Sequence, residues 1–288
     1  MDLSVHAPRA VSIIDAWAQP WTDEVVQALD ERTAHVFRRY ASGEGTAKGI
    51  ALEAMVAEMD RSPVDVTLLS GAPTVPMGLV LECLERWPDR LLGVACVDPR
   101  QGIMRAVRQL ERLVRDYPIC ALKLEPYYFE RPPTDRIFYP LFSKCEELGI
   151  TLQTQVGGTG PLYPSRPGQP LHIDELALDF PDLRVVCGHV GSPWVAEMLH
   201  VAWKHDNVFI DTSARRPRHF ETEFRTFLKT YGQDKCIYAS DWPLLSFSGP
   251  LGELDDLNLT SEVRNKFLCH NAIRAFQLEK FGIVAQPS

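Results

Sequence analysis

Short apolar runs alternate with helical segments along most of the chain. Each run is apolar across its whole length, which is typical of a strand that is buried on both faces of a parallel sheet. We expect eight such strands, at 11–15, 64–69, 91–97, 119–124, 150–155, 183–188, 208–211 and 236–240. Apolar positions with helical spacing predict helices at about 75–87, 103–117, 138–148, 172–180, 194–204, 220–231, 260–268 and 271–281.

Eight strand-helix units predict an α/β protein with a (β/α)8 TIM-barrel fold, in a single domain that spans 1–288. The interval 16–49 is expected to be a helical excursion after the first strand, with a helix at 22–40. A second helix is expected at about 47–60, and C-terminal helices occupy 257–288. A doubly wound open sheet is the structural alternative. That fold places a glycine-rich turn after its first strand, whereas Trp17-Ala18-Gln19-Pro20 contains no glycine.

The net charge limits the classes of partner, and the cysteine content indicates the redox environment of the protein. The 288 residues carry a net charge of −8, which argues against nucleic acid or an anionic membrane surface as the main partner. No apolar run predicts a transmembrane helix, and residues 1–6 lack the regions of a secretory signal. Seven scattered cysteines without a Cys-x-x-Cys pair are expected to be buried, reduced thiols of a cytoplasmic protein. A nucleophilic cysteine or a thiolate metal site is the alternative.

Polar residues follow the ends of several predicted strands, where a barrel of this kind places its active site. Asp241 ends the last strand and is the candidate catalytic acid or base. His189 follows the sixth strand and is a candidate proton donor or ligand of a substrate carboxylate. Lys123 lies inside the apolar run 119–124, and a buried ammonium must be paired or functional. We expect it to act in catalysis, by polarising a carbonyl or pairing with Asp241, or to form a structural ion pair with Glu125.

The motifs at these strand ends resemble those of a known family. In chain order they are Asp15-Ala16-x-x-x-Pro20-Trp21, Gly188-His189-Val190-Gly191-Ser192-Pro193-Trp194, Asn207-Val208-Phe209-Ile210-Asp211-Thr212-Ser213, Ser240-Asp241-Trp242-Pro243 and Asn271-Ala272-Ile273-Arg274-Ala275-Phe276. Nearly the whole chain is similar to the amidohydrolase-related metal-dependent hydrolases, which include aminocarboxymuconate-semialdehyde decarboxylase and the dihydroxybenzoate decarboxylases. The resemblance implies a TIM barrel, hydrolase or decarboxylase activity, and a divalent metal.

The chain departs from the family pattern at the metal ligands that the resemblance implies. The two histidine positions of the first strand are Trp17 and Gln19, and that of the fifth strand is Gln155. A catalytic zinc site needs about three imidazole, carboxylate or thiolate ligands. We therefore expect no tightly bound metal and no other cofactor. The alternative is one weakly held zinc or manganese ion at Asp241 and His189, or a site that enlists Glu125.

The residues that replace the metal ligands are candidates for substrate binding. Gln19 and Gln155 can hydrogen-bond to a carboxylate or carbonyl group, and Trp17 can stack on a ring. Tyr127 is a further possible ring contact, and Arg215 could clamp a carboxylate. The alternatives are that Trp17, Gln19 and Gln155 only fill space after loss of activity, and that Arg215 is a solvated loop arginine.

Three functions fit these residues. The first is a metal-independent enzyme that hydrolyses an ester, lactone or amide-like bond in a small, cyclic or conjugated carboxylated molecule, with decarboxylation or another lyase or cyclisation reaction as its variant. The second is a metal enzyme with unusual ligands, and the third is a non-catalytic binding relative. The helix at 22–40 could be a lid or a homodimer contact, and its pattern does not separate the two.

Overall fold

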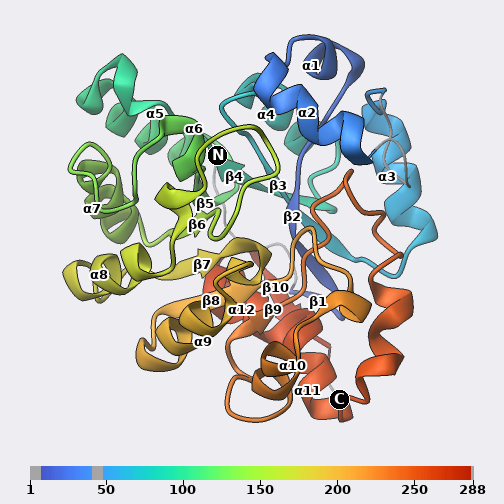
Figure 1. The fold of residues 1–288 in the computed structure, drawn as a ribbon. Coiled ribbons are helices and arrows are strands. Elements are labelled where there is room, and N and C mark those ends of the chain that lie inside the picture. Colours follow the sequence, from blue (N-terminus) through green and yellow to red (C-terminus); the bar gives the residue numbers. More distant parts are fainter. Residues whose placement is uncertain (1–7, 41–47, 287–288) are drawn as a thin grey trace.

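The computed structural model describes residues 8–40 and 48–286, and its centre is a barrel of parallel strands (Figure 1). The strands pair in chain order: β2 (Ile14–Ala18), β3 (Val66–Ser70), β4 (Leu91–Ala95), β5 (Ile119–Leu124), β6 (Thr151–Thr154), β7 (Val185–Cys187), β8 (Val208–Asp211) and β9 (Cys236–Ile237). Backbone bonds between β2 and the segment after β9 close the ring, since Ala16 N donates to Tyr238 O and Asp241 N donates to Trp17 O. The predicted α/β barrel is confirmed, and the open sheet is excluded.

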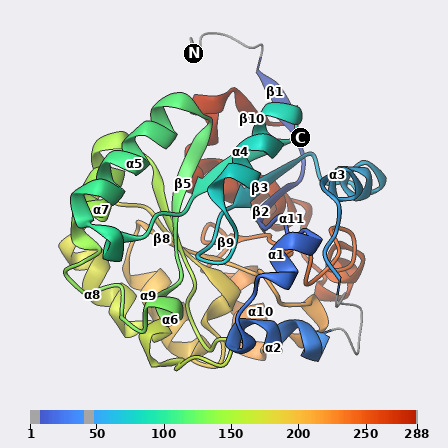
Figure 2. The ribbon, with the colours of Figure 1, turned by 90° about the horizontal axis from the view of Figure 1, so that it is seen from above.

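Helices surround the strands and cover the outside of the barrel (Figure 2). Those that connect successive strands from β3 to β9 are α4 (Met77–Arg86), α5 (Ile103–Asp116), α6 (Pro126–Phe129), α7 (Tyr139–Leu148), α8 (Leu171–Asp179), α9 (Val195–Lys204) and α10 (Thr222–Lys229). Each of the six longer helices buries an apolar stripe against the barrel, as α5 does with Ala106, Val107, Leu110 and Leu113. None of the helices in the described part of the chain combines the length and apolar character that crossing a membrane requires.

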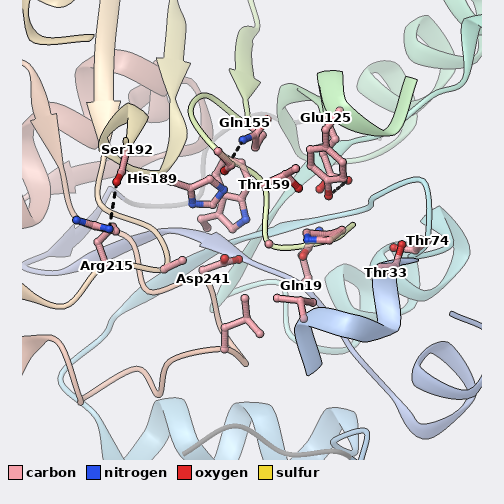
Figure 3. Close-up of a pocket in the computed structure, with 18 of the residues that line it drawn as sticks. Gln19, Thr33, Thr74, Glu125, Gln155, Thr159, His189, Ser192, Arg215 and Asp241 are labelled. Carbon is pink, nitrogen blue, oxygen red and sulfur yellow. Dashed lines mark hydrogen bonds between the residues drawn. The ribbon is translucent and has the colours of Figure 1, made fainter. Parts of the chain in front are cut away.

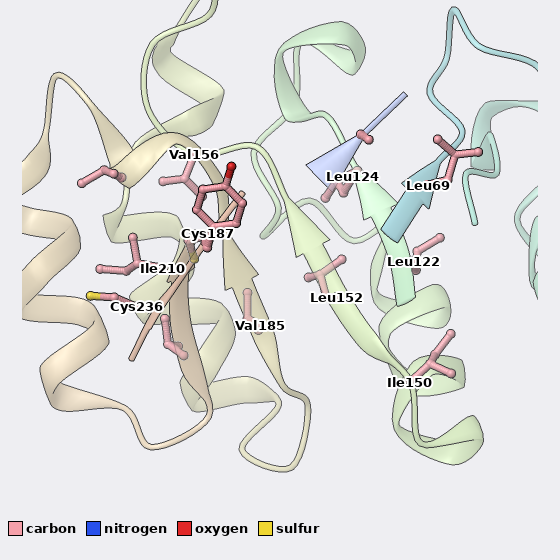
Figure 4. Close-up of a cluster of buried hydrophobic side chains, with 14 of the residues drawn as sticks. Leu69, Leu122, Leu124, Ile150, Leu152, Val156, Val185, Cys187, Ile210 and Cys236 are labelled. Carbon is pink, nitrogen blue, oxygen red and sulfur yellow. The ribbon is translucent and has the colours of Figure 1, made fainter. Parts of the chain in front are cut away.

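Alternation along each strand divides the core into two layers. In β3, Val66 and Leu68 pack inside the barrel, whereas Leu69 packs in the layer between strands and helices. Figure 4 shows part of this outer layer, including Leu69 and Leu152. Both faces of the strands are therefore buried and mostly apolar, which explains why most strands appear in the sequence as apolar runs. Lys123 in β5 and Gln153 in β6 are buried polar exceptions.

The cysteines contribute to this packing. All seven are free thiols, and all except the half-buried Cys96 are buried. Burial raises the pKa of Cys96 to about 12 and that of Cys120 to about 12, so these thiols stay protonated near neutral pH. This environment favours the structural interpretation over a nucleophilic cysteine.

Both ends of the described chain differ from the prediction. The first barrel strand is β2, so the strand expected at 11–15 was placed too early, and Asp15 lies within the strand instead of ending it. Strand β1 (Arg9–Val11) instead pairs with β10 (Ile283–Ala285) in a separate two-stranded sheet. The expected C-terminal helices are α11 (Ser261–Asn265), a π-helical turn at 266–270 and α12 (Asn271–Phe276). Gln277 adopts a left-handed conformation (φ 53°) and ends α12, so the helix expected to reach 281 was too long.

The excursion after β2 contains two helices in place of the single helix expected at 22–40. They are α1 (Asp23–Gln27) and α2 (Glu31–Tyr40), and α3 (Leu52–Arg61) follows before β3. Asp30 causes the break, because its carboxylate accepts hydrogen bonds from Thr33 N and Thr33 Oγ1 at the start of α2. The beginning of the second expected helix, at 47, lies outside the described residues, as do residues 1–6.

Candidate functional site

A cavity of about 350 Å³ lies at the carboxyl ends of the barrel strands. Figure 3 shows side chains from several strand ends converging on it. Seven of the eight predicted site residues line this cavity: Trp17, Gln19, Tyr127, Gln155, His189, Arg215 and Asp241. Other lining residues come from α2 and the loop at 158–161, and a backbone hydrogen bond from Leu162 N to Arg32 O connects the end of this loop to α2. The excursion and the loop therefore form the outer wall of the cavity.

His189 is held in one tautomer by the segment after β8. Its Nδ1 lies 3.0 Å from the carbonyl oxygen of Ser213, and a carbonyl can only accept, so Nδ1 carries the proton. Ser213 Oγ lies 2.9 Å from the same nitrogen and donates to Asp211. Burial lowers the pKa of His189 to about 4, so the ring is neutral near neutral pH. Nε2 therefore carries a lone pair and can accept a hydrogen bond.

The backbone at two strand ends adopts a conformation that is unusual for side-chain-bearing residues. His189 has φ 62° and Asp241 has φ 65°, both in the left-handed region. Such conformations cost free energy and occur often at functional sites, where they direct a side chain into position. Both residues line the cavity, which supports a functional role for each.

Asp241 is a buried carboxyl group with an environment suited to proton transfer. Burial raises its pKa to about 7, while the positive charge of Lys123 acts in the opposite direction. Negative charge on Asp211 and Glu125 raises the pKa further. The group is thus partly ionised near neutral pH, where one residue can both accept and donate a proton.

Lys123 is the predicted site residue that does not line the cavity. Its side chain is fully buried, with Nζ 3.0 Å from Ser70 Oγ and 3.7 Å from Glu125 Oε1. The same Nζ lies 3.8 Å from the centroid of the Trp17 ring. Its direct ion pair is with Glu125, and its charge also acts on Asp241 and Asp211. This placement favours electrostatic support of the site over contact with a substrate carbonyl.

The remaining predicted residues are held by their neighbours. The Trp17 ring packs against the His189 ring, with centroids 5.0 Å apart. Tyr127 Oη donates to Glu125 at 3.0 Å. Arg215 is ion-paired with Glu221 at 2.6 Å, and its Nη1 reaches Ser192 Oγ at 3.3 Å. Arg215 is therefore the guanidinium that faces this cavity, whereas Arg216 and Arg218 pair with Glu253 outside the cavity lining.

Asp211, Ser213 and Asp15 support the site, although they were not among the predicted site residues. Asp211 and Ser213 hold the ring of His189, and burial raises the pKa of Asp211 to about 6. Asp15 is buried and accepts hydrogen bonds from Ser240 N at 3.0 Å and Trp17 N at 3.1 Å, which fixes both strand ends. An acid within or at the end of an apolar run was the available signal for both aspartates.

The side chains present do not fit the divalent metal that the resemblance implies. Within the described residues, no group of three or more histidine, cysteine, aspartate or glutamate side chains is placed to hold a metal ion. Of the two retained residues, His189 offers only Nε2, since Nδ1 is bonded to Ser213. Neutral amides and an indole stand at the other positions, and these are weak ligands or none.

Comparison with known proteins agrees with the resemblance seen in the motifs. The amidohydrolase family matches residues 14–278, which is most of the chain. The chain belongs to the amidohydrolase family. The family resemblance expected from the motifs is thus confirmed, and members of this family are enzymes.

Solved structures share the barrel of this chain. A TIM-barrel protein from Bordetella bronchiseptica has a TM-score of 0.76 and 22% identity, with 94% of this chain and 99% of that chain covered. 5-Carboxyvanillate decarboxylase from Sphingomonas paucimobilis has a TM-score of 0.70 and 19% identity, with 93% of this chain and 99% of that chain covered. A probable 2-pyrone-4,6-dicarboxylic acid hydrolase from Acinetobacter baumannii has a TM-score of 0.67 and 14% identity, with 93% of this chain and 100% of that chain covered. At sequence identities this low, the similarity shows a shared fold alone.

One curated protein matches part of the sequence. It is 2-keto-4-carboxy-3-hexenedioate hydratase from Sphingobium sp. (strain NBRC 103272 / SYK-6), with 27% identity over 132 residues. The match covers 40% of this chain and 39% of the relative.

Proposed function

We propose that this protein, without a bound metal, activates water to hydrolyse an ester, lactone or amide-like bond in a small carboxylated substrate. One observation carries the proposal: the neutral His189 ring, with a lone pair on Nε2, lines the same cavity as Asp241, whose pKa burial raises to about 7. A carboxylate with this pKa is an effective base near neutral pH. A cavity of about 350 Å³ suits a small organic acid.

The proposed reaction uses Asp241 first as a base and then as an acid. The ionised carboxylate takes a proton from water while His189 Nε2 accepts the other hydrogen of that water. The water oxygen bonds to the acyl carbon, and the carbonyl electron pair moves to the carbonyl oxygen. When the intermediate collapses, the bond to the leaving group breaks and Asp241 returns its proton to the leaving atom. Atoms and protons therefore balance without a further reactant.

Positive charge for this reaction comes from the protein. Burial lowers the pKa of Lys123, and the nearby carboxylates Glu125 and Asp241 act in the opposite direction. In its charged form Lys123 favours the ionised form of Asp241. Arg215 lines the cavity and can attract a substrate carboxylate. These two groups, together with the poor fit of the site to a metal, support metal-independent chemistry.

The decisive experiment is hydrolysis of a panel of carboxylated lactones and aryl esters, with metal analysis of the same preparation. We expect turnover by protein that holds far less than one zinc or manganese ion per chain, and unchanged rates after treatment with a chelator. Near-stoichiometric metal, with activity lost on chelation and restored by that metal, would overturn the metal-independent proposal. Absence of turnover alongside tight binding of one of these acids would favour a non-catalytic binding protein.

A lyase reaction is the second candidate, because the curated relative that matches part of this chain is a hydratase. Addition of water to a conjugated carbon–carbon double bond needs the same activated water, followed by protonation at carbon by Asp241. Decarboxylation, the activity of one structural neighbour, would need that same protonation step. Reaction in ¹⁸O-labelled water separates the candidates: hydrolysis places the label in a carboxylate, hydration places it in a hydroxyl group, and decarboxylation places none in the organic product.

A further inference from the structure

The carboxylate of Glu58 bonds to two positions of the loop that follows Asp241. Glu58 belongs to α3, which lies outside the barrel and beside this loop (Figure 1). Its Oε2 accepts a hydrogen bond from Trp242 Nε1 at 3.0 Å, and its Oε1 accepts one from Phe247 N at 3.0 Å. Trp242 is buried, and its ring stacks on that of Phe247 with centroids 5.6 Å apart. One carboxylate therefore fastens both ends of the segment 242–247.

The bonding pattern at this position requires a carboxylate. Glu58 is half-buried, and it forms no ion pair with any described residue. Burial of a charge without a cation costs free energy unless hydrogen bonds replace its water. Two N–H groups meet the two oxygens here, and bonds to a charged acceptor are stronger than bonds to a neutral one. An amide of the same size would offer one acceptor and turn its NH₂ group toward the other N–H donor.

The backbone of Asp241 depends on contacts that its neighbours in the chain make. Its φ of 65° lies in the left-handed region, which a residue with a side chain keeps only where the surrounding structure holds it. On one side of Asp241, Ser240 N donates to Asp15 at 3.0 Å. On the other side, Glu58 holds the indole of Trp242. Groups on two other elements therefore fix the residues on both sides of Asp241.

We propose that Glu58 is a positioning residue for the reaction, which keeps the carboxyl group of Asp241 directed into the cavity by holding Trp242. Glu58 has this role on the basis of the proposed function, in which Asp241 acts on the substrate. Asp241 lines the cavity, whereas Glu58 does not and is not expected to touch a substrate. Loss of the Glu58 carboxylate should therefore affect the chemical step more than it affects binding.

Replacement Glu58→Gln is expected to lower kcat by about tenfold and to change KM by less than about threefold. Trp242→Phe removes the indole N–H but keeps a ring against Phe247, and it should lower kcat to a similar extent. The two losses should not add in the double variant, because the replaced groups form one bond. Glu53→Gln is the matched control, since Glu53 lies on the same helix but pairs with Arg86 of α4, and its kcat should be unchanged.

Nuclear magnetic resonance of protein with ¹⁵N-labelled tryptophan tests the bond without turnover. The chain has six tryptophans, and the indole signal of Trp242 is the one that is absent from Trp242→Phe. This signal should move upfield in Glu58→Gln, because a neutral acceptor bonds more weakly than a carboxylate. It should stay in place in Glu53→Gln.

Rates are compared per folded molecule, as measured by circular dichroism, so that a loss of stability does not imitate a loss of kcat. An unmoved Trp242 signal in Glu58→Gln, a kcat within about twofold of the wild-type value, or losses that add in the double variant would each overturn the assignment. If hydrolysis depends on Asp241 but not on Glu58, the proposed function stands and only the role of Glu58 fails. Activity that survives Asp241→Asn would instead overturn the proposed function, and the role of Glu58 with it.

Discussion

Replacement of Asp241 by asparagine is expected to lower kcat/KM by at least about a hundredfold, the scale on which positioned acid–base groups act. The amide retains the size of the carboxyl group but can no longer take a proton from water. Because burial already disfavours the charged form of Asp241, the substitution should not weaken folding. Steady-state kinetics on a hydrolysed lactone or ester, together with thermal unfolding of the same variant, provide the measurement.

The pH dependence of kcat/KM in the wild-type protein also tests whether Asp241 is the base. If Asp241 acts as the base, kcat/KM should rise by about tenfold per pH unit below the pKa of about 7 and level off above it. His189, with its pKa lowered to about 4, stays neutral over this range and adds no further step. A falling limb above about pH 7 would instead assign the protonated acid form, as carbon protonation in the lyase reaction requires.

Asp98 provides a matched control for Asp241. It also follows a barrel strand, but it is ion-paired with Arg100 at 2.9 Å and does not line the cavity. The replacement Asp98→Asn should therefore leave kcat/KM nearly unchanged. A near wild-type rate for Asp241→Asn would remove Asp241 from the mechanism.

The barrel could be predicted because its strands are buried on both faces and their apolar runs are local signals. The run 119–124 coincides with β5, whose six residues are all buried. The first strand was misplaced because its position depends on residues far along the chain. Asp15 bonds to Ser240, and residues 9–11 pair with residues 283–285. No local pattern shows such contacts.

The positions of the main site residues could be predicted, but the details of their geometry could not. Position at a strand end placed His189 and Asp241 in the cavity, because the carboxyl ends of parallel strands meet at one face. The tautomer of His189 depends on Ser213, which belongs to the next strand unit. The location of Lys123 outside the cavity lining depends on its packing against Trp17, which belongs to the first barrel strand and lies far from Lys123 in the sequence. Residue type and spacing alone do not determine either.

Replacement of Lys123 should lower the stability of the protein. The replacement Lys123→Met fills a similar volume but leaves Glu125, Asp211 and Asp241 without the buried cation. Removal of one partner from a buried ion pair typically costs about 3–5 kcal/mol in the free energy of unfolding. The carboxyl groups can offset part of this cost by taking up protons, and they do so more readily at low pH. The loss, measured by urea unfolding, should therefore be larger at about pH 8 than at about pH 6.

The replacement Lys123→Met should also shift the pH dependence of kcat/KM, which a purely structural role of Lys123 would not do. Lys123 lowers the pKa of Asp241, so its removal should shift the midpoint of the kcat/KM profile above the wild-type value of about 7. Lys144→Met is the control, because Lys144 pairs with the exposed Glu147 on α7 and such surface pairs contribute less than about 1 kcal/mol. An unchanged midpoint in Lys123→Met, with normal stability at both pH values, would show that Asp241 ionises independently of this cation. The source of the positive charge in a metal-independent mechanism would then have to be Arg215.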